Sequence, residues 1–520
     1  MSRRRPVWVI AVLGLCATAL LLAAFDAQRD DPLGATSRFG ASVALRPPAP
    51  PTRTAYTGPR RLEGVTTLRA RVRRGSSPIV AVTFLLDGEP LGTDTRAPYR
   101  LDVDASLRAP GRHRLRVAAV DALGARVTGR AVSVTTVAGR APRTVTPATL
   151  RSVLPALAKG GVRVRLAPGR YTVPQLELGD GARLVGSGPR TVLAAAARAW
   201  SVVTVRGKGV RVADLTINGD GRAKRAVAVA AGSHDVRLQR LRMRGISVTG
   251  VEVWGAHSGI SVQDSTIAGS GASGSGVFVL GSDDSRDASV IRTRIRGFRG
   301  FGVNFAQRAY DRPAAAAHAL ALDNDIAEIE DPDAADGTHE GGIWSGGVAA
   351  AIIGNRVRDT GWDGIQTVGS SRRVTVVGNR IARTRVGIYL EHETNESLFA
   401  RNVIADVGIG VNVEWRYDDA GSSSNTFEAN TILRPGETGV FVDVQGDRNR
   451  IVDNVVAGGS GPVVVLQGAS DNLVAGNRGC ERPGEAVVVQ QSARHDDGRA
   501  AHSLRNRLRD NTNAPACPSR

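Results

Sequence analysis

The sequence predicts an all-β fold in which a small β-sandwich precedes a long β-solenoid. Three observations lead to this prediction. A unit of glycine followed by alternating apolar residues recurs at Gly342, Gly364, Gly387 and Gly410, at intervals of 22 or 23 residues. A second series of units, centred on asparagine, is offset from the first, and the repeat carries no helical pattern. This period, with two strand signals and a turn in each repeat, indicates stacked coils made only of strands.

The composition suits such coils and limits the partners. Aromatic residues make up 4% of the 520 residues, whereas 61 are glycine, which favours small and β-branched side chains with tight turns. The formal net charge of +19 comes almost entirely from arginine, and it predicts attraction to polyanions such as acidic glycans. No nucleic-acid-binding motif accompanies this charge, so we expect no nucleic-acid partner.

The N-terminus has the pattern of an export segment. The basic stretch "MSRRRP" precedes an apolar run from Val7 to Phe25, which approaches the roughly 20 residues that span a bilayer. Residues 1–25 are predicted to be either a cleaved signal peptide or a retained membrane anchor. We therefore expect an extracellular or cell-envelope protein that meets the membrane only through this segment. Residues 26–60 are rich in proline and are predicted to be a disordered linker.

Two cysteines lie beyond the apolar run, which itself contains Cys16. If the chain is exported, Cys480 and Cys517 reach an oxidising compartment, where they allow a single pairing. We predict a disulfide that fastens the C-terminal tail, residues 501–520, to the rest of the chain.

Residues 61–138 have the pattern of short alternating strands separated by turns. The stretch "LLDGEPLG" is predicted to be a hairpin with Asp87 and Gly88 at its turn. The stretches "VTFLLDGEPLGTDTRAPYRLDVD" and "PGRHRLRVAAVDALG" resemble the bacterial Ig-like modules of secreted carbohydrate-active proteins. This resemblance implies a β-sandwich that serves as a spacer or a weak binder, and we assign no chemistry to it.

Residues 144–500 carry the repeat and resemble the right-handed parallel β-helix of the pectate-lyase-like superfamily. The opening "LRSVLPALAKGGVRVRLAPGRYTVPQ" is similar to the helix and first coils that cap such folds. A cap is needed because an open end exposes the core and unpaired strand edges. The asparagines are interpreted as a ladder whose side chains hydrogen-bond from turn to turn. We expect the chain to be a monomer.

Stacking of the repeats predicts which side chains share a face. Because side chains alternate along a strand, the residue after each glycine points inward and the next one points outward. The first outward column is predicted to contain Trp344, Gln366, Tyr389 and Asn412. Two residues further along the strands, the second outward column contains Glu391, Glu414 and Asp443. Like charges on coils about 4.8 Å apart repel unless a cation intervenes, so these acids are a candidate Ca²⁺ site.

Aromatic and polar residues surround the two columns. Asp363 begins the stretch "DGIQTV", His392 follows the first acid, and His339 ends the longest insertion between repeats. Solenoids place their insertions on the binding face, so we predict a groove for a polysaccharide, neutral or anionic. The predicted substrate-binding residues are Trp344, Gln366, Tyr389, Asn412, Trp415, Tyr417, Asp443 and His339.

Two enzymatic chemistries and one non-catalytic role fit this groove. The candidate catalytic residues are Glu391, Glu414, Asp363, His392 and Arg416. A glycoside hydrolase would use two carboxylates about 5 Å apart, as on adjacent coils, or about 6.5–9.5 Å apart. A lyase would need a cation or an arginine to neutralise a substrate carboxylate, and a base to remove a proton. The alternative is an adhesin or structural glycan-binding protein of the cell envelope.

Motifs of known enzymes do not choose between these chemistries. The stretch "WDGIQTVGSS" resembles the "DGI" strand of polygalacturonase-type hydrolases, but the paired aspartates and the His-Gly and Arg-x-Lys elements of that family are absent. The Asp-Pro-His-Asp motif of alginate epimerases is also absent, because "EDPDAAD" has no histidine after its proline. We therefore predict an exported carbohydrate-active protein that binds and cleaves a polysaccharide, with lyase and hydrolase chemistry both open.

Overall fold

The structure is a computed structural model. It describes residues 49–73, 75–282, 285–307, 318–331, 339–414, 421–482, 484–495, 498–515 and 517. The predicted export segment, residues 1–25, and the predicted linker as far as residue 48 lie outside this part of the chain. Within the described ranges, no helix is both long and apolar enough to cross a membrane.

The N-terminal module is a β-sandwich, as predicted. One sheet contains β1 (Arg53–Tyr56), β3 (Val65–Arg73) and β6 (Arg100–Asp104). The other contains β2 (Arg61–Glu63), β9 (Val132–Val137), β7 (Gly111–Asp121), β4 (Ile79–Leu86), β5 (Glu89–Asp94) and β8 (Arg126–Thr128). The predicted hairpin joins β4 and β5, where Asp87 and Gly88 have φ of 53° and 94°. A two-residue hairpin turn requires this left-handed backbone.

The start of this module differs from the prediction. The linker was expected to reach residue 60, but Arg53–Tyr56 forms β1, which pairs antiparallel with β3. Tyr56 is 8% exposed and belongs to the apolar core of the sandwich. A four-residue strand next to a proline-rich stretch offers too few alternations to be recognised in the sequence.

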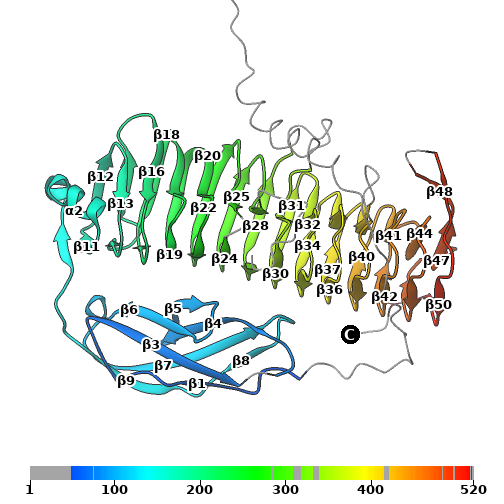
Figure 1. The fold of residues 1–520 in the computed structure, drawn as a ribbon, viewed down its shortest axis with the longest axis horizontal. Helices are drawn as coiled ribbons and strands as arrows, with labels where there is room; N and C mark the ends of the chain where they lie inside the picture. The colour runs from blue at the N-terminus through cyan, green and yellow to red at the C-terminus, as the bar shows by residue number, and fades with distance from the viewer. Residues whose placement is uncertain are drawn as a thin grey trace, which may run out of the picture. The chain divides into compact units, whose positions relative to one another are not determined.

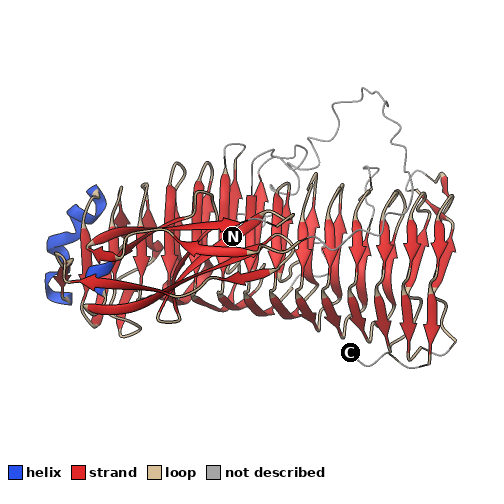
Figure 2. Cartoon of the chain, turned by 90° about the horizontal axis from the view of Figure 1, so that it is seen from below, coloured by secondary structure: helices blue, strands red, loops and turns tan. Residues whose placement is uncertain are grey.

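From β10 (Arg143–Val145) onward the chain forms a parallel β-helix, whose strands follow one another along the solenoid in Figure 1. One face is a sheet of 15 strands that begins with β10, β11 (Arg163–Leu166), β14 (Arg183–Val185), β17 (Arg211–Ala213) and β19 (His234–Gln239). A second sheet has 25 strands, and β48 (Ala493–Arg494) and β49 (Ala500–Ala501) form a separate two-stranded sheet. The 3₁₀ helix η2 (Pro147–Val153) and α2 (Leu154–Lys159) lie at the first coils (Figure 2). They bury Leu150, Val153 and Leu157 against these coils, which confirms the predicted cap.

The repeated glycine is required by the packing of neighbouring coils. A Cβ atom on Gly387 would lie 2.4 Å from Ile404 Cγ2 and 2.5 Å from the carbonyl oxygen of Gly410. Gly364 has the same surroundings, 2.3 Å from Ile381 Cγ2. The apolar residue after each glycine fills the core, as predicted: Ile365 and Ile388 are 0% exposed.

The asparagines form the predicted ladder on the turns. Each side-chain amide donates to the amide oxygen of the next asparagine at 2.8–3.0 Å, through Asn324, Asn355, Asn379, Asn402, Asn430, Asn454, Asn477 and Asn511. The same nitrogens also donate to backbone carbonyls. The structure adds a second ladder, made by Asn425, Asn449, Asn472 and Asn506.

The solenoid extends beyond its predicted end at residue 500. In the segment predicted to be a tail, β50 (Arg507–Arg509) pairs with β45 (Leu473–Ala475), and β51 (Thr512–Ala514) pairs with β46 (Arg478–Cys480). The predicted disulfide joins Cys480 and Cys517, with 5.1 Å between their Cα atoms.

The Ig-like module lies in contact with the 15-stranded sheet. The backbone of Thr93 exchanges two hydrogen bonds of 2.9 Å with the side chain of Gln263 in β21 (Ser258–Gln263). A buried apolar cluster joins both parts of the chain through Ala81, Val120, Ile291, Leu320, Leu322 and Ile353. This docked arrangement differs from the spacer that the resemblance implied.

Candidate functional site

The predicted outward columns lie on five strands of the 25-stranded sheet. These strands are β29 (Ile343–Gly346), β32 (Asp363–Val368), β35 (Val386–Glu391), β38 (Ile409–Val413) and β41 (Thr438–Val442). Their parallel register brings the first column together as Trp344, Gln366, Tyr389 and Asn412. The backbone ladder continues past the strand ends, since Glu414 N donates to Leu390 O and Asp443 N donates to Val413 O. The acids of the second column therefore follow one another on consecutive coils.

Each acid of the second column is held by a different neighbour. Glu391 Oε2 accepts a hydrogen bond of 3.0 Å from Gln366 Nε2. Glu414 Oε2 accepts one of 2.5 Å from the Tyr389 hydroxyl, and Asp443 Oδ1 accepts one of 3.2 Å from Gln467 Nε2. Each carboxylate is therefore oriented by a different donor.

The expected Ca²⁺ site stays a prediction. Among the described residues, no three histidine, cysteine, aspartate or glutamate side chains are grouped so that they could hold a metal ion.

Aromatic rings gather beside the acids. The His339 ring stacks on the Trp362 ring, with 4.3 Å between centroids and 9° between planes. The same histidine ring lies 5.4 Å from the ring of Tyr389, and the Arg385 guanidinium lies over Trp362 at 3.9 Å. His339, which follows the long insertion, therefore lies beside Trp362 and Tyr389, and its role in substrate binding stays a prediction.

The column is built of buried polar groups rather than a solvated rim. Tyr389 is 1% exposed, Gln366 4% and Glu391 9%. Three amide oxygens, Asn304 Oδ1, Gln366 Oε1 and Asn412 Oδ1, are buried without a hydrogen-bond partner among the described residues. Buried acceptors are costly when unpaired, and sugar hydroxyl groups are donors that would satisfy them. Asn304 was not predicted as a site residue, although it occupies the outward position of its strand opposite Trp344.

The turn after Glu391 has an unusual backbone. His392 and Glu393 have φ of 49° and 55°, and they are the only two consecutive non-glycine residues with positive φ in the described chain. This conformation costs energy at each residue and clusters at functional sites. It places His392 Nε2 3.4 Å from Glu391 Oε1 and lets Glu393 Oε2 accept a hydrogen bond of 3.0 Å from Ser370. The predicted neighbours Glu391 and His392 are thus in contact.

Two other predictions for this site have different outcomes. Asp363, predicted to be catalytic, is the first residue of β32 and is 0% exposed. Its complete burial distinguishes it from Glu391, and its predicted catalytic role stays a prediction. Trp415, Arg416 and Tyr417 lie outside the described residues, and their predicted roles stay predictions.

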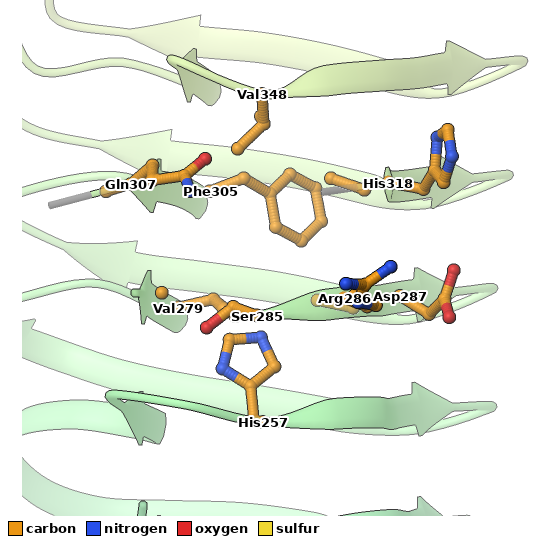
Figure 3. Close-up of a pocket in the computed structure, with 13 residues that line it drawn as sticks. His257, Val279, Ser285, Arg286, Asp287, Phe305, Gln307, His318 and Val348 are labelled. Carbon is orange, nitrogen blue, oxygen red and sulfur yellow. The ribbon is translucent and has the colours of Figure 1, made fainter. Parts of the chain in front are cut away.

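A separate small cavity lies on earlier coils (Figure 3). His257, Phe305 and Val348 are among the residues that line its volume of about 20 Å³. This volume is enough for one water molecule and too small for a sugar. His257 Nδ1 lies 2.8 Å from the carbonyl oxygen of Gly255, and burial lowers the pKa of the histidine. We therefore regard the cavity as part of the interior rather than as a binding site.

Comparisons with protein families agree with the two-part architecture. Residues 315–479 match the family described as a right handed beta helix region, and residues 52–117 match a bacterial Ig domain. The chain is therefore a right-handed parallel β-helix preceded by an Ig-like β-sandwich, as the sequence predicted. No curated protein matches the sequence.

Solved structures show distant similarity. A family 28 exopolygalacturonase of Yersinia enterocolitica is 12% identical, with a TM-score of 0.43 over 89% of this chain and 99% of that chain. A periplasmic alginate epimerase is 12% identical, with a TM-score of 0.36 over 70% of this chain and 83% of that chain. The Dettilon tailspike protein is 12% identical, with a TM-score of 0.39 over 64% and 66% of the two chains. At this level of similarity, the function has to be argued from the site itself.

Proposed function

We propose that β29 to β41 carry a groove that binds a polysaccharide, and that Glu391 and Glu414 cleave the bound chain. The observation that carries the proposal is the pair of acids on adjacent coils, each oriented by a neutral donor: Gln366 for Glu391 and Tyr389 for Glu414. Adjacent coils are about 4.8 Å apart, which suits the separation of about 5–5.5 Å between the two carboxyl groups of a retaining glycosidase.

The proposed roles follow from the surroundings of each acid. Glu414, oriented by the Tyr389 hydroxyl, would attack the anomeric carbon. Glu391, with His392 beside it, would donate a proton to the leaving oxygen and then take one from the incoming water. The unpaired amide oxygens of Gln366 and Asn412 would accept hydrogen bonds from sugar hydroxyls. The disulfide between Cys480 and Cys517 supports the proposed export, because such bonds persist in oxidising compartments.

The test is a screen of the full chain against neutral and acidic polysaccharides, with Ca²⁺ or with EDTA. New reducing ends without absorbance near 232 nm would support hydrolysis, whereas absorbance of unsaturated uronides would replace it with lyase chemistry. E391Q and E414Q should each lose product formation by roughly 10³-fold or more, while glycan binding is retained.

The matched control is E428Q, an exposed glutamate in β39 (Thr426–Glu428) of the other sheet, which should retain full activity. Product formation that survives in both E391Q and E414Q would disprove the assigned roles. Binding without any product across the panel would show that the groove serves a glycan-binding protein instead.

A further inference from the structure

A column of arginines runs along the 15-stranded sheet, on the coils next to the cap. The parallel register places Arg163, Arg183, Arg211 and Arg237 opposite one another on β11, β14, β17 and β19. Because consecutive coils are about 4.8 Å apart, these cations repel one another unless anions lie between them.

Acids neutralise three of the four arginines. Arg163 pairs with Asp104 of the Ig-like module at 2.5 Å, and Arg183 pairs with Asp102 at 3.5 Å. A third pair joins Arg211 to Asp235, at 2.9 Å.

Arg237 differs from the other three. No ion pair or side-chain hydrogen bond joins it to any described residue, and its buried Nε lacks a partner. Burial, reinforced by the charge of Arg211, lowers the pKa of Arg237 to about 9. At neutral pH this side chain is therefore a cation that forms no direct ion pair with a described residue, although Asp235, Asp94 and Asp102 lie near enough to raise its pKa.

Arg237 lines a cavity of about 310 Å³ between the Ig-like module and the solenoid. Its charged lining residues are six arginines and three aspartates: Arg108, Arg165, Arg183, Arg211, Arg237, Arg240, Asp102, Asp104 and Asp214. All three aspartates are already paired, since Asp214 accepts two hydrogen bonds from Arg240 and the other two face the arginine column. The lining residues thus carry a formal excess of three positive charges, one of which, on Arg211, is paired with Asp235 outside the lining.

We propose that this cavity binds an oxyanion, with Arg237 as its principal ligand. A carboxylate, phosphate or sulfate presents two oxygens to the planar donors of one guanidinium, which is the geometry that arginine binds best. Two sources supply such a group: the carboxylate of an acidic sugar, or a free inorganic anion. The site lies on the opposite sheet from the groove of Glu391 and does not depend on the function proposed for that groove.

Binding should also depend on the Ig-like module. Leu91, Leu107 and Arg108 of that module close one side of the cavity, whereas Arg237 and Arg240 come from β19 and the turn after it. An anion held between them would therefore stabilise the docked arrangement by RT ln(1 + [L]/Kd) at a free anion concentration [L].

The experiment is calorimetric titration of the full chain at constant ionic strength with inorganic phosphate, with a hexuronate monosaccharide and with glucose as a neutral control. We expect one saturable site for an anion and none for glucose. R237Q should weaken binding at least 10-fold, because it removes the unpaired cation. R244Q should bind like the wild type, because Arg244 is exposed in β20 (Arg242–Trp254) of the other sheet.

The outcomes separate the two sources and the competing explanations. Tighter binding of the hexuronate than of phosphate identifies a sugar carboxylate, and the reverse order identifies a free anion. The proposal is overturned if R237Q binds like the wild type, or if no anion gives a saturable signal. If R237Q fails to fold, R237K retains the charge and should still weaken binding by losing the planar donor pair. E391Q should leave the anion titration unchanged, so failure at one site is distinguishable from failure at the other.

Discussion

Replacing Asn402 with alanine should weaken the solenoid more than an ordinary polar substitution. Asn402 is 0% exposed and lies in the middle of the asparagine ladder. Its Nδ2 donates to Asn430 Oδ1 and to Val376 O, both at 2.9 Å. Its Oδ1 accepts from the backbone and side-chain nitrogens of Asn379, both at 3.0 Å. At about 0.5–1.5 kcal/mol for each bond, the loss amounts to roughly 2–6 kcal/mol.

The assay combines urea unfolding with hydrogen exchange. Because the coils of a solenoid contact only their neighbours, unfolding need not be two-state, and a local probe is required. The amide of Asn379, which donates to Asn402 Oδ1, should exchange much faster in N402A. The matched control is N218A, since Asn218 Oδ1 accepts a single hydrogen bond, of 3.0 Å, from Asp220 N. An N402A protein that loses no more stability than N218A would refute the additive reasoning about the ladder.

Four other perturbations have defined outcomes. G387A should destabilise the chain by about 1–3 kcal/mol in thermal unfolding, because the new Cβ would meet Ile404 at 2.4 Å; an unchanged melting temperature would show that the coils can separate. Reduction of the Cys480–Cys517 disulfide, which joins residues 37 apart, should cost roughly 2–4 kcal/mol and raise hydrogen exchange first in β50 and β51. Hydrogen bonds from Arg383 lower the pKa of Asp359 to about 2, below the value of about 3.9 for an unfolded chain. The stability they contribute is complete above pH 4 and lost as the pH falls towards 2, and D359N should remove this acid-side slope. Since the pKa of Arg237 is about 9, phosphate binding should decline as the pH rises through 9, and a pH-independent affinity would contradict the role of that cation.

The sequence was sufficient for the coil register and for which side chains point outward, because both depend on local alternation and on glycines that admit no Cβ. It was insufficient for contacts that cross from one coil to the next. Whether Tyr389 bonds to Glu414 depends on side-chain rotamers that the repeat pattern does not specify. The burial of Asp363 is likewise not predictable from the repeat, because Asp363 lies directly before the repeated glycine and belongs to neither outward column.

Long intervals hid other features. Asn506 and Asn511 continue the two ladders, but they come 34 residues after Asn472 and Asn477. Because this interval is longer than the repeat, the sequence pattern predicts a tail where the last coil lies. The arginine column is spaced irregularly in the sequence. Its acidic partners Asp102 and Asp104 belong to the Ig-like module, and no sequence pattern predicts that this module contacts the arginines.

The two ends of the solenoid are closed by different means. The first coils are covered by α2 and η2, whereas β50 and β51 stand last in the two sheets and Leu504 and Leu508 beside them are 53% and 42% exposed. Open strand edges can template the addition of a second chain, coil upon coil. At this end the disulfide between Cys517 and Cys480 fastens the chain after β51 to β46. This bond persists only in an oxidising environment. One end of the solenoid is thus held by apolar packing and the other by a covalent bond.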